Sequence, residues 1–196
     1  MLKNKKIIKI PLPIDLNFWK PIDKKISRKM LNLPENKKII LIGSERIDIE
    51  RKGFYLVKEI LNKIDKDRSI AIIFGRNTNK VEAIKGLKII YFGEVEPNSY
   101  DLKILYSAAD LFLAPSIQES FGQTVLEGAS CNLPSICFKN NGISEIIKHK
   151  INGYIAEESN IDDFANGVNW CLNNLKDIQM KENLKYIENK FSFDLI

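Results

Sequence analysis

Residues 111–127 read LFLAPSIQESFGQTVLE, and they contain the strongest structural signal in the chain. The apolar run 111–114 is typical of a buried strand, Pro115-Ser116 marks a turn, and a helical pattern begins near Gly122. Strand, loop and helix in this order are the repeating unit of α/β proteins. Loops that leave the carboxyl ends of parallel strands form the ligand crevice of such folds. The stretch therefore predicts an α/β domain with a binding site at this loop.

The same alternation of apolar runs and helical patterns continues on both sides of this stretch. Strands are predicted at 38–43, 70–74, 89–92, 111–114, 135–138 and 153–156. Helices are predicted at 54–64, 100–108, 123–130, 143–147 and 161–175. Alternating units of this kind imply a parallel sheet with helices on both faces. The predicted fold class is α/β, with a single Rossmann-like domain.

The predicted sheet domain, residues 37–175, has a different region at each end. Residues 1–36 are interrupted by prolines and are predicted to be a linker with a short lead-in helix at 23–31. Residues 176–196 are predicted to form a helical C-terminal tail.

Composition indicates one globular domain. The chain has 196 residues, of which 44% are hydrophobic, enough to bury a sound core. It contains no apolar run near the roughly 18 residues that span a membrane, and Ile7-Ile8 is too short for the core of a signal peptide. The cysteines at 131, 137 and 171 form no C-x-x-C pair, so reduced thiols and a cytoplasmic location are expected.

The net charge of +5 is modest, and the lysines are scattered rather than gathered in an arginine-rich stripe. Nucleic-acid binding is therefore not expected. A biased composition explains most of this charge. The remainder leaves open an attraction to phosphate-bearing ligands or to anionic lipid, and with it a peripheral contact at the inner face of the membrane.

Two carboxylates flank the start of the predicted helix 123–130. The main-chain amides of Gly122, Gln123 and Thr124 favour an anion such as phosphate. Glu119 lies in the loop beside them, and Glu127 points back from inside the helix. Carboxylates repel phosphate, so sugar hydroxyls are their natural partners. The pattern suits a nucleotide-sugar, with amides for the pyrophosphate, one Glu for the ribose diol and one for the transferred sugar.

The loop 43–53 supplies positive charge to the same place. It leaves the first strand of the body at its carboxyl end, so it opens onto the same crevice. It carries Arg46, Arg51 and Lys52. Fixed cations stabilise the charge on a departing pyrophosphate without a metal.

Glu119 and Glu127 form an E-x7-E motif, and from about residue 10 to residue 193 an ordered set of further motifs surrounds it. In these motifs the chain resembles family 4 of the retaining glycosyltransferases with the GT-B fold. A lone E-x7-E is weak, whereas the ordered set is highly specific. The other motifs that carry the resemblance are Ile10-Pro11-Leu12-Pro13-Ile14-Asp15, Arg51-Lys52-Gly53, Phe92-Gly93-Glu94-Val95, Tyr106-Ser107-Ala108-Ala109-Asp110, Leu133-Pro134-Ser135, Asn141-Gly142-Ile143-Ser144-Glu145-Ile146 and Asn152-Gly153-Tyr154.

The resemblance implies that residues 37–175 bind a nucleotide-diphosphate sugar, such as a UDP- or GDP-sugar, with no further cofactor and no metal. Glu119 is expected to be catalytic, orienting the sugar and stabilising its cationic transition state, while Glu127 is expected to hold the ribose. Lys52 is expected at the diphosphate. Either Arg46 or Arg51 is expected beside it, and the sequence leaves both arginines open.

Three other positions have expected roles by the same resemblance. Phe121 is either a donor contact or an anchor of the loop. Val95, in Gly93-Glu94-Val95, is expected to lie against the nucleotide base through its main chain. Gly142 is expected to permit a close approach of sugar or phosphate, and Asn141 stands where the family often has another glycine.

In an intact enzyme of this kind, the sugar passes with retention to a hydroxyl of a glycan or lipid-linked acceptor. An N-terminal Rossmann-like domain holds the acceptor, and this chain begins where the linker of the family stands. The chain is therefore expected to be the donor-binding half, with a truncated tail and a first domain supplied in cis or in trans. The alternative is a non-catalytic nucleotide-sugar binding module or a subunit of a split transferase. An epimerase of GT-B fold is less favoured by the motif context.

Two metal-site alternatives are weighed and set aside. Asp65-Lys66-Asp67 is formally a D-x-D pattern, but it follows a helix and precedes a strand, which predicts a solvated turn at the opposite edge of the sheet. His149 is the only histidine and has no Cys at ligand spacing, so metal binding is not expected there.

Overall fold

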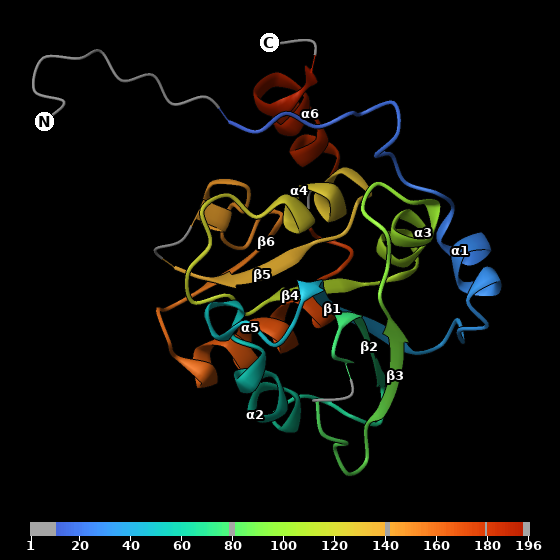
Figure 1. Ribbon diagram of the computed structural model, residues 1–196, viewed down its shortest axis with the longest axis vertical. Helices are drawn as coiled ribbons and strands as arrows, with labels where there is room; N and C mark the ends of the chain where they lie inside the picture. Colours follow the sequence, from blue (N-terminus) through green and yellow to red (C-terminus); the bar gives the residue numbers. More distant parts are fainter. Residues whose placement is uncertain (1–10, 79–80, 140–141, 179, 194–196) are drawn as a thin grey trace, which may run out of the picture.

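The computed structural model describes residues 11–78, 81–139, 142–178 and 180–193. In this part of the chain, six parallel strands form one sheet in the order β3-β2-β1-β4-β5-β6 (Figure 1). The strands are β1 (Lys38–Arg46), β2 (Ser69–Arg76), β3 (Lys88–Gly93), β4 (Leu111–Ala114), β5 (Ser135–Phe138) and β6 (Gly153–Ala156). The predicted α/β class is confirmed. The positions Ile10 and Asn141, which contributed to the resemblance, lie outside the described residues.

Helices connect the strands and flank them in the chain. The α-helices of the described chain are α1 (Lys24–Met30), α2 (Val57–Asn62), α3 (Tyr100–Ala108), α4 (Gln123–Ser130), α5 (Ile161–Asn173) and α6 (Met180–Phe191). Short 3-10 helices are η1 (Glu50–Lys52), η2 (Phe54–Leu56) and η4 (Gly142–Glu145). The predicted bounds of α3 and α4 agree with the structure to the residue.

The predicted helix 143–147 is wrong, because the structure has the 3-10 helix η4 there. The side chain of Asn152 explains the early end, since it donates to the carbonyl of Ile146 at 3.1 Å and accepts from the amide of Lys148 at 2.6 Å. These two backbone groups are thereby withdrawn from a continuing helix. The turn that follows leads directly into β6.

The predicted helix 54–64 is also shorter than expected. It begins with the 3-10 helix η2, and α2 occupies only Val57–Asn62. Gly53 precedes it with φ 68°, a left-handed conformation that offers no side chain to cap the first turn. The strand before this loop is longer than predicted, because β1 continues past a bulge until Arg46 pairs with Arg76 of β2.

Alternating strand residues build two cores, one on each face of the sheet. Ile39, Leu41 and Phe112 face one core, which is closed by α3, α4 and α6. Ile40 and Leu113 face the other, which is closed by α2 and α5. Both faces are therefore covered, as Figure 1 shows, and this explains why the central strands read as continuous apolar runs. The chain's three cysteines are buried and free.

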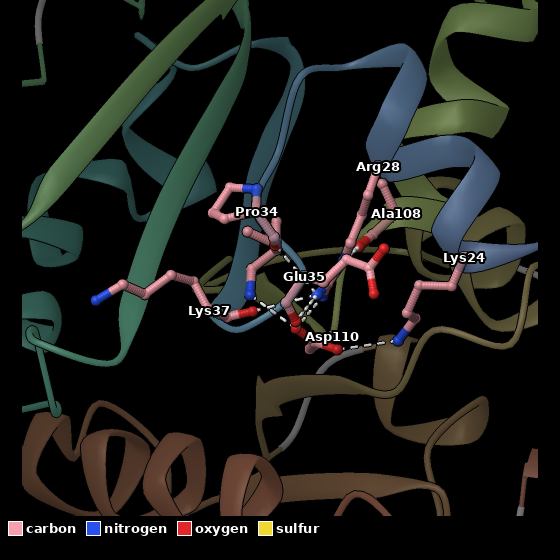
Figure 2. Close-up of polar contacts among 8 residues, drawn as sticks. Lys24, Arg28, Pro34, Glu35, Lys37, Ala108 and Asp110 are labelled. Carbon is pink, nitrogen blue, oxygen red and sulfur yellow. Dashed lines mark hydrogen bonds and ion pairs between the residues drawn. The ribbon is translucent and has the colours of Figure 1, made fainter.

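A buried ion pair fixes the lead-in helix α1 to the sheet (Figure 2). The guanidinium of Arg28 donates to Asp110 Oδ2 at 2.5 Å and to the carbonyl oxygens of Ala108 and Glu35, each at 3.0 Å. Asp110 Oδ2 also accepts the amide of Ile39 at 2.8 Å, at the start of β1. The arginine is 5% exposed, so its charge depends on these partners for compensation. The lead-in region is thus an integral part of the fold.

The segment before α1 and the end of α6 lie side by side (Figure 1). Ile14 forms a parallel bridge with Ser192, and its amide donates to the carbonyl of Phe191 at 2.7 Å. The Phe191 ring lies edge-on to Phe121 at 5.6 Å. These contacts connect both ends of the described chain to the loop before α4.

The strand order reverses at the pair β1 and β4, since β2 and β3 follow on one side and β5 and β6 on the other. In doubly wound sheets, ligands bind outside the carboxyl ends of the strands at such a switch point. The loops that leave β1 and β4 therefore lie where a fold of this kind binds its ligand.

Candidate functional site

The loops after β1 and β4 are joined to each other by main-chain contacts. The amide of Ile117 donates to the carbonyl of Arg51 at 2.8 Å. Gly53 lies so close to the other loop that a Cβ there would be 1.9 Å from the carbonyl oxygen of Pro115. Only glycine fits at this point, and its φ of 68° adds a second reason. The glycine of the Arg51-Lys52-Gly53 motif thus sets the distance between the two loops.

Lys52 and Glu119 meet at this junction. Lys52 Nζ lies 2.5 Å from Glu119 Oε2, and the side chains are 19% and 15% exposed. A second cation stands close by, because Arg51 Nη1 is 3.9 Å from the same oxygen. The pair is half-buried, so water screens its attraction less than that of a surface pair. Residues that are 67 positions apart in the chain form one charged cluster at the switch point.

The loop after β5 joins the cluster from the other side. The amide of Gly142 donates to the carbonyl of Glu119 at 2.7 Å. A Cβ on Gly142 would lie 2.0 Å from the carbonyl oxygen of Ser120, so the close approach that this glycine permits is to protein backbone. Three loops from adjacent strands therefore hold the main chain around Glu119.

Helix α4 begins directly beside this cluster and has no side chain at its N-cap. The N-cap is Gly122, in the left-handed region at φ 90°, and no side-chain hydrogen bond caps the helix among the described residues. In contrast, α1, α3 and α5 are capped by Asp23, Ser99 and Asn160. The amides at the start of α4, including those of Gln123 and Thr124, thus have the geometry that attracts an anion.

Glu127 lies one turn inside α4 and is buried, at 6% exposed. Its Oε2 accepts a hydrogen bond from the hydroxyl of Tyr106 at 3.1 Å. Burial raises the pKa of the Glu127 carboxyl from its ordinary 4.5 to about 7, although hydrogen bonds from Tyr106 and Gln123 work against this shift. At neutral pH this carboxyl therefore stands between its protonated and ionised forms.

A cavity of about 510 Å³ opens at the start of α4. Gln123 lines it together with Asn98 of the loop before α3 and the aromatic side chains of Phe18 and Trp19. Gln123 is the first residue of α4 and lies one turn before Glu127, so the cavity is at the same end of the helix as the buried carboxylate.

The two arginines that the sequence could not distinguish, Arg46 and Arg51, lie in different surroundings. Arg51 stands beside Glu119, whereas Arg46 ends β1 and pairs with Asp48 at 3.2 Å. Phe121 is half-buried and its ring packs against Phe191, an arrangement that anchors the loop before α4. Val95 is half-buried against the core.

The segment Gly93-Glu94-Val95 leaves the edge strand β3 in an open conformation. Gly93 has φ 86°, and a Cβ placed on it would meet no atom within 4 Å. The side chain of Glu94 turns away to Arg76, at 2.5 Å. The space beside the α-carbon of Gly93 is therefore open.

The acidic turn and the histidine lie away from the cluster around Glu119. Asp65 and Asp67 precede β2, at the amino end of the sheet, while Glu119 follows β4 at the carboxyl end. His149 accepts the amide of Ile155 at 3.1 Å and its ring contacts Tyr154. Within the described residues, no group of three or more His, Cys, Asp and Glu side chains is arranged to hold a metal ion.

These features define an α/β domain of the glycosyltransferase type, and its structural neighbours are GT-B glycosyltransferases. The chain belongs to the family of glycosyl transferases group 1, whose model matches residues 23–191. An uncharacterized glycosyltransferase of Methanocaldococcus jannaschii is 27% identical over 198 residues, covering 95% of this chain and 49% of the relative. The chain thus spans about half the length of the curated relatives it matches.

Two solved structures illustrate the likeness in fold. Sucrose-phosphate synthase from Thermosynechococcus elongatus superposes with a TM-score of 0.83 at 20% identity, covering 98% of this chain and 50% of that one. HepE of Anabaena, solved in complex with UDP and glucose, gives a TM-score of 0.74 at 20% identity, covering 92% of this chain and 52% of that one.

Among the described helices, none has the length and apolarity to cross a membrane.

Sequence reasoning missed two parts of the site. It read Tyr106 only as one letter of a motif, and it did not place Phe18 and Trp19 of the lead-in region at the cavity. Both depend on contacts between segments that are distant in the sequence. Tyr106 and Glu127, for example, are 21 residues apart. The available signal was a tyrosine at an apolar position of α3, because a buried tyrosine hydroxyl needs a partner.

Proposed function

We propose that this chain is the donor-binding half of a retaining glycosyltransferase and holds a nucleotide-diphosphate sugar at the carboxyl ends of β1 and β4. The ion pair between Lys52 and Glu119 carries this proposal. It joins a cation suited to a diphosphate with a carboxylate suited to a sugar, beside a helix start that favours phosphate. The complex of HepE with UDP and glucose, a neighbour in fold, supports the same ligand class.

In this proposal the diphosphate binds between Lys52 and the first amides of α4. Lys52 is engaged with Glu119 in the free chain, so an arriving diphosphate competes for the ammonium group. Each charge-assisted hydrogen bond gained contributes about 1.5 to 3 kcal/mol. Arg51, which already stands near Glu119, supplies the second positive charge for the leaving group. The site needs no divalent ion because these groups neutralise the diphosphate.

The release of Lys52 from Glu119 gives the carboxylate its part in the reaction. Once the ammonium turns to the diphosphate, Glu119 is free to orient the sugar and to stabilise the positive charge that develops at its anomeric carbon. The departing diphosphate remains on the same face as the cationic cluster. An acceptor hydroxyl that attacks from this face gives a product with retained configuration.

Glu127 holds the ribose diol from inside α4, and the main chain of Gly93-Glu94-Val95 lies against the base. The cavity lined by Gln123 lies at the N-terminal end of α4, the end toward which a side chain at position 127 leans, and this supports the proposal. The acceptor, a hydroxyl of a glycan or of a lipid-linked sugar, is held by a second Rossmann-like domain in cis or in trans. The chain covers 49% of the Methanocaldococcus jannaschii relative, which is consistent with such a partner domain.

The test is a calorimetric titration of the chain with UDP, GDP and ADP, each alone and as a sugar conjugate. At least one nucleoside diphosphate should bind, and Lys52→Ala should weaken it about tenfold, the scale of one charge-assisted hydrogen bond. Lys58→Ala is the matched control, because Lys58 pairs with Glu82 on exposed surface. If none of the three diphosphates binds, or if both lysine variants weaken binding equally, the proposed site is wrong.

A further inference from the structure

The hydrogen bond between Tyr106 and Glu127 joins two helices that pack on the same face of the sheet. Tyr106 belongs to α3 and Glu127 to α4, and the hydroxyl lies 3.1 Å from Glu127 Oε2. The tyrosine is fully buried and the glutamate nearly so. A contact of this kind between a neutral donor and a buried carboxylate fixes the orientation of both groups.

The ring of Tyr106 is held in place by other aromatic side chains. It lies edge-on to Phe112 at 5.9 Å and to Phe74 at 6.3 Å, and it is tilted against Trp19 at 5.8 Å. Trp19 also lines the cavity at the start of α4. The position of the Tyr106 ring, and with it the reach of its hydroxyl toward α4, is therefore set by packing among these aromatic side chains.

Gly128 allows the ring of Tyr106 to pack against α4 directly after Glu127. A Cβ at this glycine would already be in van der Waals contact with the ring, 3.5 Å from Cδ1 of Tyr106. A larger side chain at position 128 would push the ring away from α4 and lengthen the hydrogen bond to Glu127. The sequence Glu127-Gly128 thus suits a tyrosine that reaches the carboxylate from α3.

We propose that Tyr106 is a positioning residue for nucleotide binding, whose hydroxyl turns the carboxylate of Glu127 into a fixed acceptor for the ribose diol. The proposal rests on the proposed function, in which Glu127 holds the ribose. Tyr106 acts through Glu127 and needs no contact with the ligand. Its hydroxyl binds Oε2 from the side of α3, and Gln123, one turn earlier in α4, lines the cavity.

The hydroxyl also favours the ionised form of the carboxyl, which is the better acceptor. Burial raises the pKa of Glu127, and the hydrogen bond from Tyr106 lowers it. Burial and the nearby Glu127 raise the pKa of Tyr106 well above its ordinary 10.0, so the hydroxyl remains a donor across neutral pH. The other titratable group that acts on this pair is Cys131, and Lys103 of α3 faces that thiol.

The experiment compares the chain with Tyr106→Phe and Tyr154→Phe, using the nucleoside diphosphate among UDP, GDP and ADP that the chain binds. Tyr106→Phe keeps the ring and removes only the hydroxyl. It is expected to weaken binding about tenfold at pH 6.5 and about twofold or less at pH 9, where Glu127 ionises without help. Tyr154→Phe is the control, because it removes another tyrosine hydroxyl bonded to a carboxylate, that of Asp163, on the opposite face.

Two further measurements separate positioning from a general loss of structure. The preference for the nucleotide over its 2′,3′-dideoxy analogue should fall in Tyr106→Phe and stay unchanged in Tyr154→Phe. In a Glu127→Gln background, Tyr106→Phe should no longer shift the pH dependence of binding. An equal loss at pH 6.5 and pH 9, or an unchanged preference for the ribose diol, would overturn the role of Tyr106 while leaving the proposed function intact. No binding of any of the three diphosphates by the unaltered chain would overturn the proposed function first, and this inference with it.

Discussion

Replacing Glu127 by Gln should stabilise the domain at alkaline pH, because the native state holds a carboxyl group where ionisation is costly. Its pKa is about 7 in the folded chain against an ordinary 4.5. The native state therefore retains a proton that the unfolded chain has lost, and stability falls as the pH rises from 4.5 through 7. The difference of 7 − 4.5, at about 1.36 kcal/mol for each pKa unit, corresponds to about 3 kcal/mol.

The assay is urea denaturation of the chain and of Glu127→Gln at several values between pH 4 and pH 8. Glutamine keeps an acceptor for the Tyr106 hydroxyl and cannot ionise. The two curves should give similar free energies of unfolding near pH 4 and diverge to about 3 kcal/mol at pH 8, with the variant more stable. Glu96→Gln, at an exposed position, is the control for general charge effects. A constant difference across this range would show that Glu127 does not titrate as its burial requires.

Three other predictions concern the charged groups. Because Glu119 competes with a diphosphate for Lys52, Glu119→Gln should raise the affinity for the bare nucleoside diphosphate several-fold. The same variant should bind the sugar conjugate less tightly than it binds the bare diphosphate. Calorimetry decides this, and a weaker affinity for the bare diphosphate would contradict the competition. Donor affinity should be unchanged in excess EDTA; a tenfold loss that magnesium restores would show that the cationic cluster is not sufficient. Asp110→Asn should cost about 3 to 5 kcal/mol of stability, because it leaves the guanidinium of Arg28 buried without its charged partner. Denaturation next to the exposed control Asp101→Asn measures this, and a loss below about 1 kcal/mol would mean that other contacts hold α1 in place.

Much of the fold could be predicted because its elements have strong local signals. The strands at 111–114, 135–138 and 153–156 are short apolar runs between turn residues, and the structure has them at the same bounds. The predicted bounds are wrong at positions where a group distant in the sequence determines the end of a helix or strand. The side chain of Asn152 ends the helical turn near Ile146, and pairing with β2 extends β1 to Arg46. Neither effect has a signature in the local pattern of apolar residues.

The position of the site followed from topology, whereas its internal contacts did not. A loop after one strand and a loop after another were predicted to open onto one crevice, and Lys52 and Glu119 meet there. Which arginine stands beside Glu119 depends on how the loop is folded, and the 3-10 helix η1 brings Arg51 there while Arg46 remains in β1. The pairing of Glu127 with Tyr106 needs the packing of α3 on α4, which the sequence pattern of either helix alone does not contain.

The burial of Glu127 argues for function more strongly than its place in a motif does. A residue chosen only for stability at this position would be apolar or a glutamine, since an ionised carboxyl here opposes folding at neutral pH. The surrounding structure nevertheless provides for the charge, because the hydroxyl of Tyr106 in α3 donates to the same carboxyl group. A buried carboxyl group that costs stability and yet has its own donor is the expected signature of a site that needs a strong, fixed acceptor. The same reasoning distinguishes Glu127 from Asp110, whose buried charge is fully used by Arg28, Lys24 and the amide of Ile39 and leaves nothing for a ligand.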